Sequence, residues 1–88
     1  MTRAIVVVFH MVGCPHCPPA LEASSKIKTA HILHIRSDHP IVKELGIASF
    51  PTIWVSLPNS LFDYGAKPRD TPSLEQFVMD KISNNNPF

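Results

Sequence analysis

The sequence predicts a single α/β domain in which three helices flank a four-stranded mixed β-sheet, in the order βαβαββα. Two runs rich in β-branched residues, 5–9 and 31–36, are separated by a helix-forming segment, which is the pattern of a βαβ unit. Towards the other end, a turn at residues 58–60 joins two further strands as an antiparallel hairpin. The domain is expected to span residues 1–88, because a chain of 88 residues fills only one core.

The first three elements follow from residue patterns. The unbroken apolar run 5–9 is typical of a strand that is covered on both faces. Segment 20–28 is rich in helix formers, and three of its residues share one face: Ala20, Ala23 and Ile27. Residues 31–36 return to strand chemistry, so a right-handed crossover is expected between two parallel strands.

The second half predicts a short helix, a hairpin and a longer helix. Ser37 or Asp38 can cap a helix that ends at Leu45, and Gly46 stands where a helix stop is expected. Strands are expected at 50–57 and 61–64.

The last helix is predicted from its start signals and its apolar spacing. Thr71 is the expected N-cap and Pro72 the first helical residue. Its apolar residues recur at helical spacing: Leu74, Phe77, Val78 and Ile82. The polar segment 83–88 is expected to be a frayed tail.

The composition argues against two classes of partner, nucleic acids and membranes. Eight Lys and Arg against seven Asp and Glu give a net charge of +1, and the basic residues are scattered, which argues against a nucleic-acid partner. The apolar run near the start is far shorter than the roughly 18 residues of a membrane span. We therefore expect a monomer without a membrane or nucleic-acid partner. The chain shows no recognisable targeting segment, so a cytoplasmic location is expected.

The two cysteines are Cys14 and Cys17, and they lie between a predicted strand and a predicted helix. Their spacing is too short for a disulfide that stabilises by closing a long loop, so catalysis or metal binding is the better interpretation. At Gly13-Cys14-Pro15-His16-Cys17 the chain resembles the thioredoxin superfamily, which includes thioredoxins, glutaredoxins and protein disulfide isomerases. A thioredoxin fold is what this resemblance implies.

The chemistry of such a loop assigns different roles to the two sulfurs. Cys14 lies where unpaired backbone N–H groups at the start of a helix favour a thiolate, so it is the expected nucleophile, with a pKa below that of a free thiol. Cys17 is the expected resolving thiol, which attacks the mixed disulfide. His16 can place a protonated ring beside the thiolate and so make the disulfide more oxidising. The Pro15-His16 pair is typical of strongly oxidising members of the superfamily.

A second resemblance lies far from the cysteines. Ser49-Phe50-Pro51-Thr52-Ile53 is similar to the superfamily's segment in which a cis proline packs opposite the cysteine loop. The resemblance implies a cis Phe50–Pro51 bond, with the backbone of Ser49 and Phe50 pairing with a substrate chain. Met11, together with Val12 and the Pro15 ring, is the candidate apolar rim for a protein substrate. Phe62 to Gly65, followed by Arg69 and the last helix, is also similar to the end of such domains.

Departures from the superfamily bear on the subclass. Val8 stands where thioredoxins have a buried acid, and Gly13 replaces their tryptophan before the cysteines. Met11 replaces the basic residue that glutaredoxins place near glutathione, and their glycine pair is absent. Glutathione and a reductase stay candidate partners beside protein disulfides and dithiols, and no cofactor is required.

Metal binding is an alternative interpretation of the same cysteines. Cys14 and Cys17 are followed by His31 and His34, close to a two-cysteine, two-histidine zinc pattern. The histidine spacing is one residue short, and in a strand residues three apart point to opposite faces. An iron–sulfur cluster shared between two chains and a non-catalytic adaptor are further alternatives. The preferred hypothesis is a thiol–disulfide oxidoreductase, with no metal among its site residues.

Overall fold

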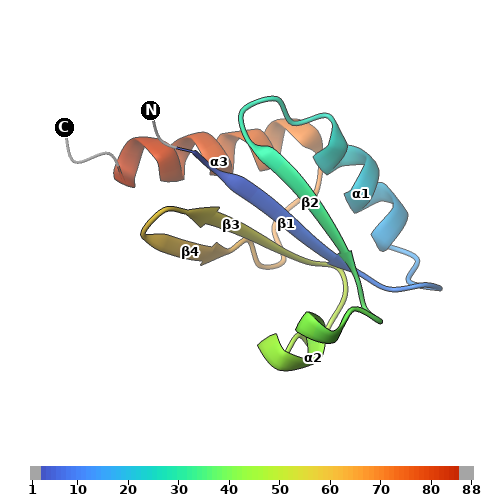
Figure 1. Ribbon diagram of the computed structural model, residues 1–88. Helices are drawn as coiled ribbons and strands as arrows, with labels where there is room; N and C mark the ends of the chain where they lie inside the picture. The colour runs from blue at the N-terminus through green and yellow to red at the C-terminus, as the bar shows by residue number, and fades with distance from the viewer. Residues whose placement is uncertain (1–2, 86–88) are drawn as a thin grey trace.

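The computed structural model describes residues 3–85, and it contains the predicted order of elements (Figure 1). The strands and helices are β1 (Ile5–His10), α1 (Cys17–Ser25), β2 (His31–Arg36), α2 (Pro40–Leu45), β3 (Thr52–Leu57), β4 (Ser60–Asp63) and α3 (Thr71–Asn85). Within the described residues, no helix combines the length and the apolar character needed to cross a membrane.

The four strands form one mixed sheet in the order β2-β1-β3-β4. β1 pairs with β2 in parallel, with Val8 opposite His34, and with β3 antiparallel, with Val8 opposite Ile53. β3 and β4 form the predicted antiparallel hairpin. β1 is therefore central, and the loop that follows it leaves from the middle of the sheet. The predicted mixed α/β sheet is confirmed.

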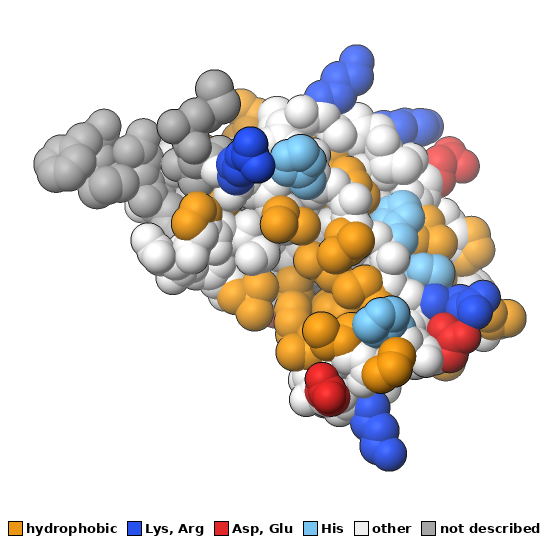
Figure 2. Space-filling model, in the orientation of Figure 1, with side chains coloured by type: hydrophobic (Ala, Val, Ile, Leu, Met, Phe, Trp, Pro, Cys, Tyr) orange, Lys and Arg blue, Asp and Glu red, His pale blue; other side chains and the backbone are white. Residues whose placement is uncertain are grey.

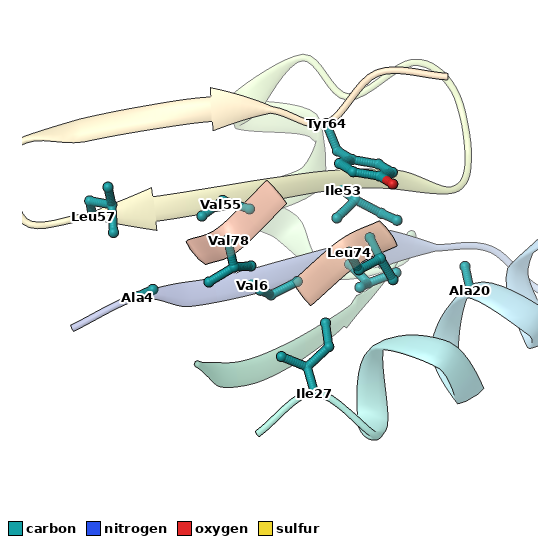
Figure 3. Close-up of a cluster of buried hydrophobic side chains, with 11 residues drawn as sticks. Ala4, Val6, Ala20, Ile27, Ile53, Val55, Leu57, Tyr64, Leu74 and Val78 are labelled. Carbon is teal, nitrogen blue, oxygen red and sulfur yellow. The ribbon is translucent and has the colours of Figure 1, made fainter. Parts of the chain in front are cut away.

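The hydrophobic core lies between one face of the sheet and the helices α1 and α3 (Figure 3). Each element contributes side chains from one face only. In a strand, successive side chains point to opposite faces of the sheet, and in a helix, residues three or four apart share a face. The core residues include Val6 and Val8 of β1, Ile53 and Val55 of β3, Ala20 of α1, Ile27 just after it, and Leu74 and Val78 of α3. This packing fixes the start of α1 against the end of β1.

The opposite face of the sheet is only partly covered, which corrects the expectation that β1 is covered on both faces. Ile5 and Leu33 are exposed there, and Phe9 is buried, its ring edge-on to Trp54 with centroids 4.9 Å apart. α2 lies at one end of the sheet, and hydrophobic side chains gather over the middle of the face seen in Figure 2. A helix as short as α2 cannot shield the whole face.

Helix α1 begins at Cys17 and ends at Ser25, about three residues earlier at both ends than predicted. Pro18 and Pro19 fall in the first turn, where backbone N–H groups have no partner within the helix, so the prolines cost no helical hydrogen bond. Ile27 follows the helix, and its side chain is nevertheless buried in the core. Its N–H donates to the carbonyl of Ser24, which continues the turn beyond the end of the helix.

Helix α2 is capped by neither Ser37 nor Asp38, contrary to the prediction. The ring Nδ1 of His39 accepts a hydrogen bond from the N–H of Ile41 at 3.1 Å, so His39 is the N-cap. Asp38 instead pairs with the guanidinium of Arg36 at 2.6 Å. Gly46 ends the helix with a φ of 72°, which glycine adopts without steric cost, and this stop was predicted.

Helix α3 is capped by Asp70 rather than by Thr71. Oδ1 of Asp70 accepts from the N–H of Ser73 at 2.9 Å. The Thr71 hydroxyl donates instead to the carbonyl of Ala23 at 2.9 Å, which joins α3 to α1. The helix continues to Asn85, so residues 83–85 are helical and not the expected tail, while 86–88 lie outside the described residues.

Candidate active site

The cysteine loop connects the end of β1 to the start of α1. Gly13 has a φ of 85°, a conformation in the region that favours glycine, and this turn brings the N–H of Cys14 to the carbonyl of Met11 at 3.3 Å. Cys17 is the first residue of α1, and its N–H donates to the carbonyl of Cys14 at 3.3 Å. Both sulfurs therefore lie at the N-terminal end of a helix, as the sequence predicted. Both cysteines are free.

The surroundings of Cys14 favour its thiolate. The thiol of Cys17 donates a hydrogen bond to the Cys14 sulfur, which lowers the pKa of Cys14 below that of an ordinary thiol. Burial opposes this shift, whereas the backbone N–H groups of His16 and Cys17 and the positive charge of Arg69 strengthen it. The predicted direction of the shift is confirmed.

The pKa of Cys17 is shifted in the opposite direction, upward. It is 2% exposed, against 8% for Cys14, and its burial raises the pKa of its thiol. The hydrogen bond that it donates to Cys14 raises this pKa further, because that bond requires the proton. The side chain of Val8, where thioredoxins have an acid, is fully buried and cannot accept this proton. The pKa values of the two thiols are thus shifted in opposite directions, so that the thiolate is favoured at Cys14 and the protonated thiol at Cys17.

His16 lies at the N-cap position of α1, but its side chain makes no capping hydrogen bond. The ring is exposed to solvent, and the contribution of this residue to the pKa of Cys14 comes from its backbone N–H. Prolines occupy the two positions that follow Cys17, so the backbone donors at this helix end are few. The N–H groups of His16 and Cys17 are the ones directed at the nucleophile.

The Phe50–Pro51 peptide bond is cis, as the resemblance implied. The sulfur of Cys14 lies 3.5 Å from the carbonyl oxygen of Phe50, so two segments that are 36 residues apart in sequence meet at the reactive atom. Pro51 is buried, Phe50 is partly buried, and Ser49 is exposed at the edge of the site. The carbonyl of Ser49 accepts a hydrogen bond from the Thr52 hydroxyl at 2.7 Å, which fixes the bend before β3.

Three apolar side chains of the loop face solvent. Met11 is 43% exposed, Val12 is exposed still further, and Pro15 is exposed beside Cys14. They flank the nucleophile in sequence and lie on the same loop. The three predicted rim residues are therefore exposed on the loop that carries Cys14, and their contact with a protein substrate stays a prediction.

Arg69 is a site residue that the sequence analysis did not identify as such. Its positive charge lowers the pKa of both Cys14 and Cys17, although it is more than 50 residues away in sequence. It lies in the segment between β4 and α3, and it lines a cavity with Ser49 and Pro51. The only signal in the sequence was its position after the Tyr64-Gly65 run.

The histidines of the zinc pattern lie on different faces of β2. His31 pairs with Ile5 and His34 with Val8 in the parallel register, so the two rings leave the strand on opposite sides. The Nε2 of His34 is 2.9 Å from the hydroxyl of Ser24 in α1. Among residues 3–85, no three Cys, His, Asp or Glu side chains are grouped as ligands of a metal ion.

Comparison with solved structures identifies the architecture. The first two thioredoxin domains of Eps1p from Saccharomyces cerevisiae match with a TM-score of 0.77 and 20% identity, over 96% of this chain and 37% of that one. The J-Trx1 fragment of ERdj5 gives 0.74 and 21%, over 92% and 44%. The chain has the thioredoxin fold. Thioredoxin-2, a component of malaria parasite protein secretion machinery, gives 0.73 and 17%, over 90% and 84%.

The chain thus spans less than half of the Eps1p and ERdj5 structures that it matches. No protein-family model and no curated protein sequence matches it. At about one identical residue in five, the likeness establishes the thioredoxin fold alone. Within that fold, a cysteine pair of unequal acidity beside a cis proline supports a redox function.

Proposed function

We propose that this protein is a thiol–disulfide oxidoreductase that exchanges disulfides with protein or small thiol substrates through Cys14 and Cys17. The observation that carries the proposal is the geometry of the cysteine loop. Cys17 begins α1, and the Cys14 sulfur lies 3.5 Å from the carbonyl of Phe50, next to the cis Pro51. A thiolate is the attacking species in disulfide exchange, and a neighbouring thiol is needed to complete the reaction. The directions of the two thiol pKa shifts agree with these roles.

The reaction consists of two exchanges. The Cys14 thiolate attacks one sulfur of a substrate disulfide, forms a mixed disulfide, and releases the other substrate sulfur as a thiolate that takes up a proton. Cys17 then loses its proton and attacks the Cys14 sulfur, which releases the second substrate thiolate. The substrate disulfide is reduced by two electrons, and Cys14 and Cys17 become a disulfide. The reverse sequence oxidises a substrate dithiol.

The neighbouring residues have supporting roles in this proposal. The backbone of Ser49 and Phe50, next to Pro51, positions the substrate chain against the Cys14 sulfur. Met11 and Pro15 supply apolar contact for protein substrates. When protonated, the His16 ring stabilises the Cys14 thiolate and makes the disulfide more oxidising. The recycling partner, the cytoplasmic location and the monomeric state stay predictions.

The test is an insulin-reduction assay with dithiothreitol as the terminal reductant. We expect the wild-type protein to accelerate the reaction and Cys14→Ser to lose the acceleration, because the attacking sulfur is gone. When reduced Cys17→Ser is mixed with insulin in the absence of dithiothreitol, it should retain the first attack and accumulate a mixed disulfide with the substrate, visible by mass spectrometry. If Cys14→Ser and the wild type were equally active, or equally inactive, the proposal would fail and a non-catalytic adaptor would be the better hypothesis.

A further inference from the structure

Arg69, which lies near the cysteine loop, has no hydrogen-bond or ion-pair partner among the residues that the structure describes. Its Nε atom is sealed from solvent, and no hydrogen-bond acceptor within the described residues reaches it. The two ion pairs of the described chain are Lys26–Glu22 and Arg36–Asp38, so neither includes Arg69. A buried donor of a charged group is almost always paired, because leaving it unpaired is unfavourable. The guanidinium therefore has hydrogen-bonding capacity that the described residues leave unused, and a ligand can reach the half-buried side chain from the cavity that Arg69 lines.

The backbone on both sides of Arg69 is held in place. Before it, the hydroxyl of Tyr64 donates to the carbonyl of Pro68, and the Tyr64 ring is buried against Phe77. After it, Asp70 caps α3 by accepting from the N–H and the hydroxyl of Ser73, at 2.9 and 3.0 Å. The guanidinium therefore extends from a fixed segment, and less conformational freedom is lost when it binds a ligand.

Arg69 lines a cavity of about 240 Å³ together with residues of the cis-proline segment. Ser49 and Pro51 are among these residues, and the carbonyl of Phe50, which lies between them in the chain, is 3.5 Å from the Cys14 sulfur. A substrate chain that passes along Ser49 and Phe50 towards Cys14 would therefore run beside the cavity. Side chains next to the substrate cysteine are the ones close enough to enter it.

The two charged residues of the cavity wall, Arg69 and Asp63, differ in their hydrogen bonds. The Asp63 carboxylate accepts a hydrogen bond from the N–H of Gly65 at 2.8 Å, and the carboxylate of Asp70, the next residue along the chain, accepts from Ser73. Within residues 3–85, the guanidinium of Arg69 has no ion-pair partner, and it offers several donors in a geometry that fits a carboxylate.

We propose that Arg69 binds a carboxylate side chain of the substrate, so that the protein prefers peptide disulfides in which Glu or Asp flanks the cysteine. This inference rests on the proposed disulfide exchange and names the substrate class of the same site. The cavity that Arg69 lines includes Ser49 and Pro51, and the carbonyl of Phe50 between them lies 3.5 Å from the Cys14 sulfur, so a carboxylate bound in this cavity would lie beside the path of the substrate chain to Cys14. Arg69 is a specificity-determining residue in this account, whereas Cys14 and Cys17 carry out the chemistry.

The experiment compares matched peptide disulfides that differ only in Glu or Gln at each of the two positions on either side of the cysteine. The rate constant for attack by the reduced protein is measured for each peptide and divided by the rate constant for dithiothreitol, which corrects for intrinsic reactivity. For the wild type we expect the Glu peptide to react about two- to fivefold faster at one or more positions. The preference should fall in high salt, because an exposed ion pair is screened.

Variants of Arg69 and Asp63 separate binding of the substrate carboxylate from effects on the pKa of Cys14. Arg69→Met should bring the corrected Glu/Gln ratio to about one, and Arg69→Lys should keep part of the preference. Any change that these variants cause in the pKa of Cys14 affects both peptides alike and cancels in the ratio. Asp63→Asn removes the opposing charge of the cavity and should increase the wild-type preference. Circular dichroism confirms that each variant is folded.

The outcomes are distinct. A Glu/Gln ratio that is equal in the wild type and Arg69→Met at every position would overturn the carboxylate subsite while disulfide exchange stands. A wild-type preference for Gln or for a Lys peptide would overturn it as well. If no peptide reacts with the wild type, disulfide exchange itself fails and the subsite fails with it.

Discussion

At the scale of single residues, one loop gives its two thiols different pKa values. Cys14 receives hydrogen bonds from Cys17 and from two backbone N–H groups, whereas Cys17 is more buried and donates its own proton. The cysteine loop, the lowered pKa of Cys14 and the cis proline were predictable, because each belongs to a short local motif. Arg69 was not, since its action on the sulfurs depends on how a segment 52 residues beyond Cys17 packs.

The role proposed for the His16 ring is tested by His16→Ala. The backbone N–H directed at Cys14 is retained in this variant, so only the effect of the ring is removed. We expect the Cys14–Cys17 disulfide to become less oxidising, because a protonated ring no longer stabilises the thiolate of the reduced form. The redox equilibrium with glutathione measures this shift. An unchanged equilibrium constant would mean that the ring has no such role.

At the scale of helices and strands, the order of elements was predictable, and several boundaries were not. Helix α1 begins before its two prolines, because the first turn has no hydrogen bonds for them to break. Asp38 and Thr71 are good capping residues, but the first pairs with Arg36 and the second bonds to Ala23. In both cases the side chain bonds to another partner instead of capping the helix, and sequence patterns do not show which of the two interactions forms.

The bond between α1 and α3 is tested by Thr71→Val. This change removes the hydroxyl that donates to Ala23 but keeps the shape of the side chain, so we expect a loss of about 1 kcal/mol in the free energy of unfolding. Thr71→Ser keeps the hydroxyl and should lose less. Urea unfolding of the two variants gives the comparison, and equal losses would show that the hydrogen bond does not contribute.

At the scale of the whole molecule, stability depends on one face of one sheet. The core lies between that face and the helices α1 and α3, while the opposite face is partly open (Figure 2). The sequence predicted the sheet and the buried helix faces, because alternation and helical spacing are visible in it. It also suggested that β1 is covered on both faces, which is wrong because α2 is short and lies at the end of the sheet.

This arrangement predicts different effects for two positions in α3. Leu74 is 2% exposed in the core, so Leu74→Ala should lower the free energy of unfolding by about 2–5 kcal/mol through the cavity that it leaves. Met79 is 50% exposed, and Met79→Ala should change it by less than about 0.5 kcal/mol. Both are measured by urea unfolding of the reduced protein. Similar losses at the two sites would contradict the packing of α3 against the core through one face of the helix.

The most direct test of the account is a pH titration of thiolate absorbance in the reduced protein. We expect a first transition below the pH at which a free thiol ionises, which disappears in Cys14→Ser, and a second transition above it, which disappears in Cys17→Ala. In Cys17→Ala, the transition that remains should move to higher pH, because the thiol that donates to Cys14 is gone. Two cysteines that ionise together, at the pH of a free thiol, would contradict the account.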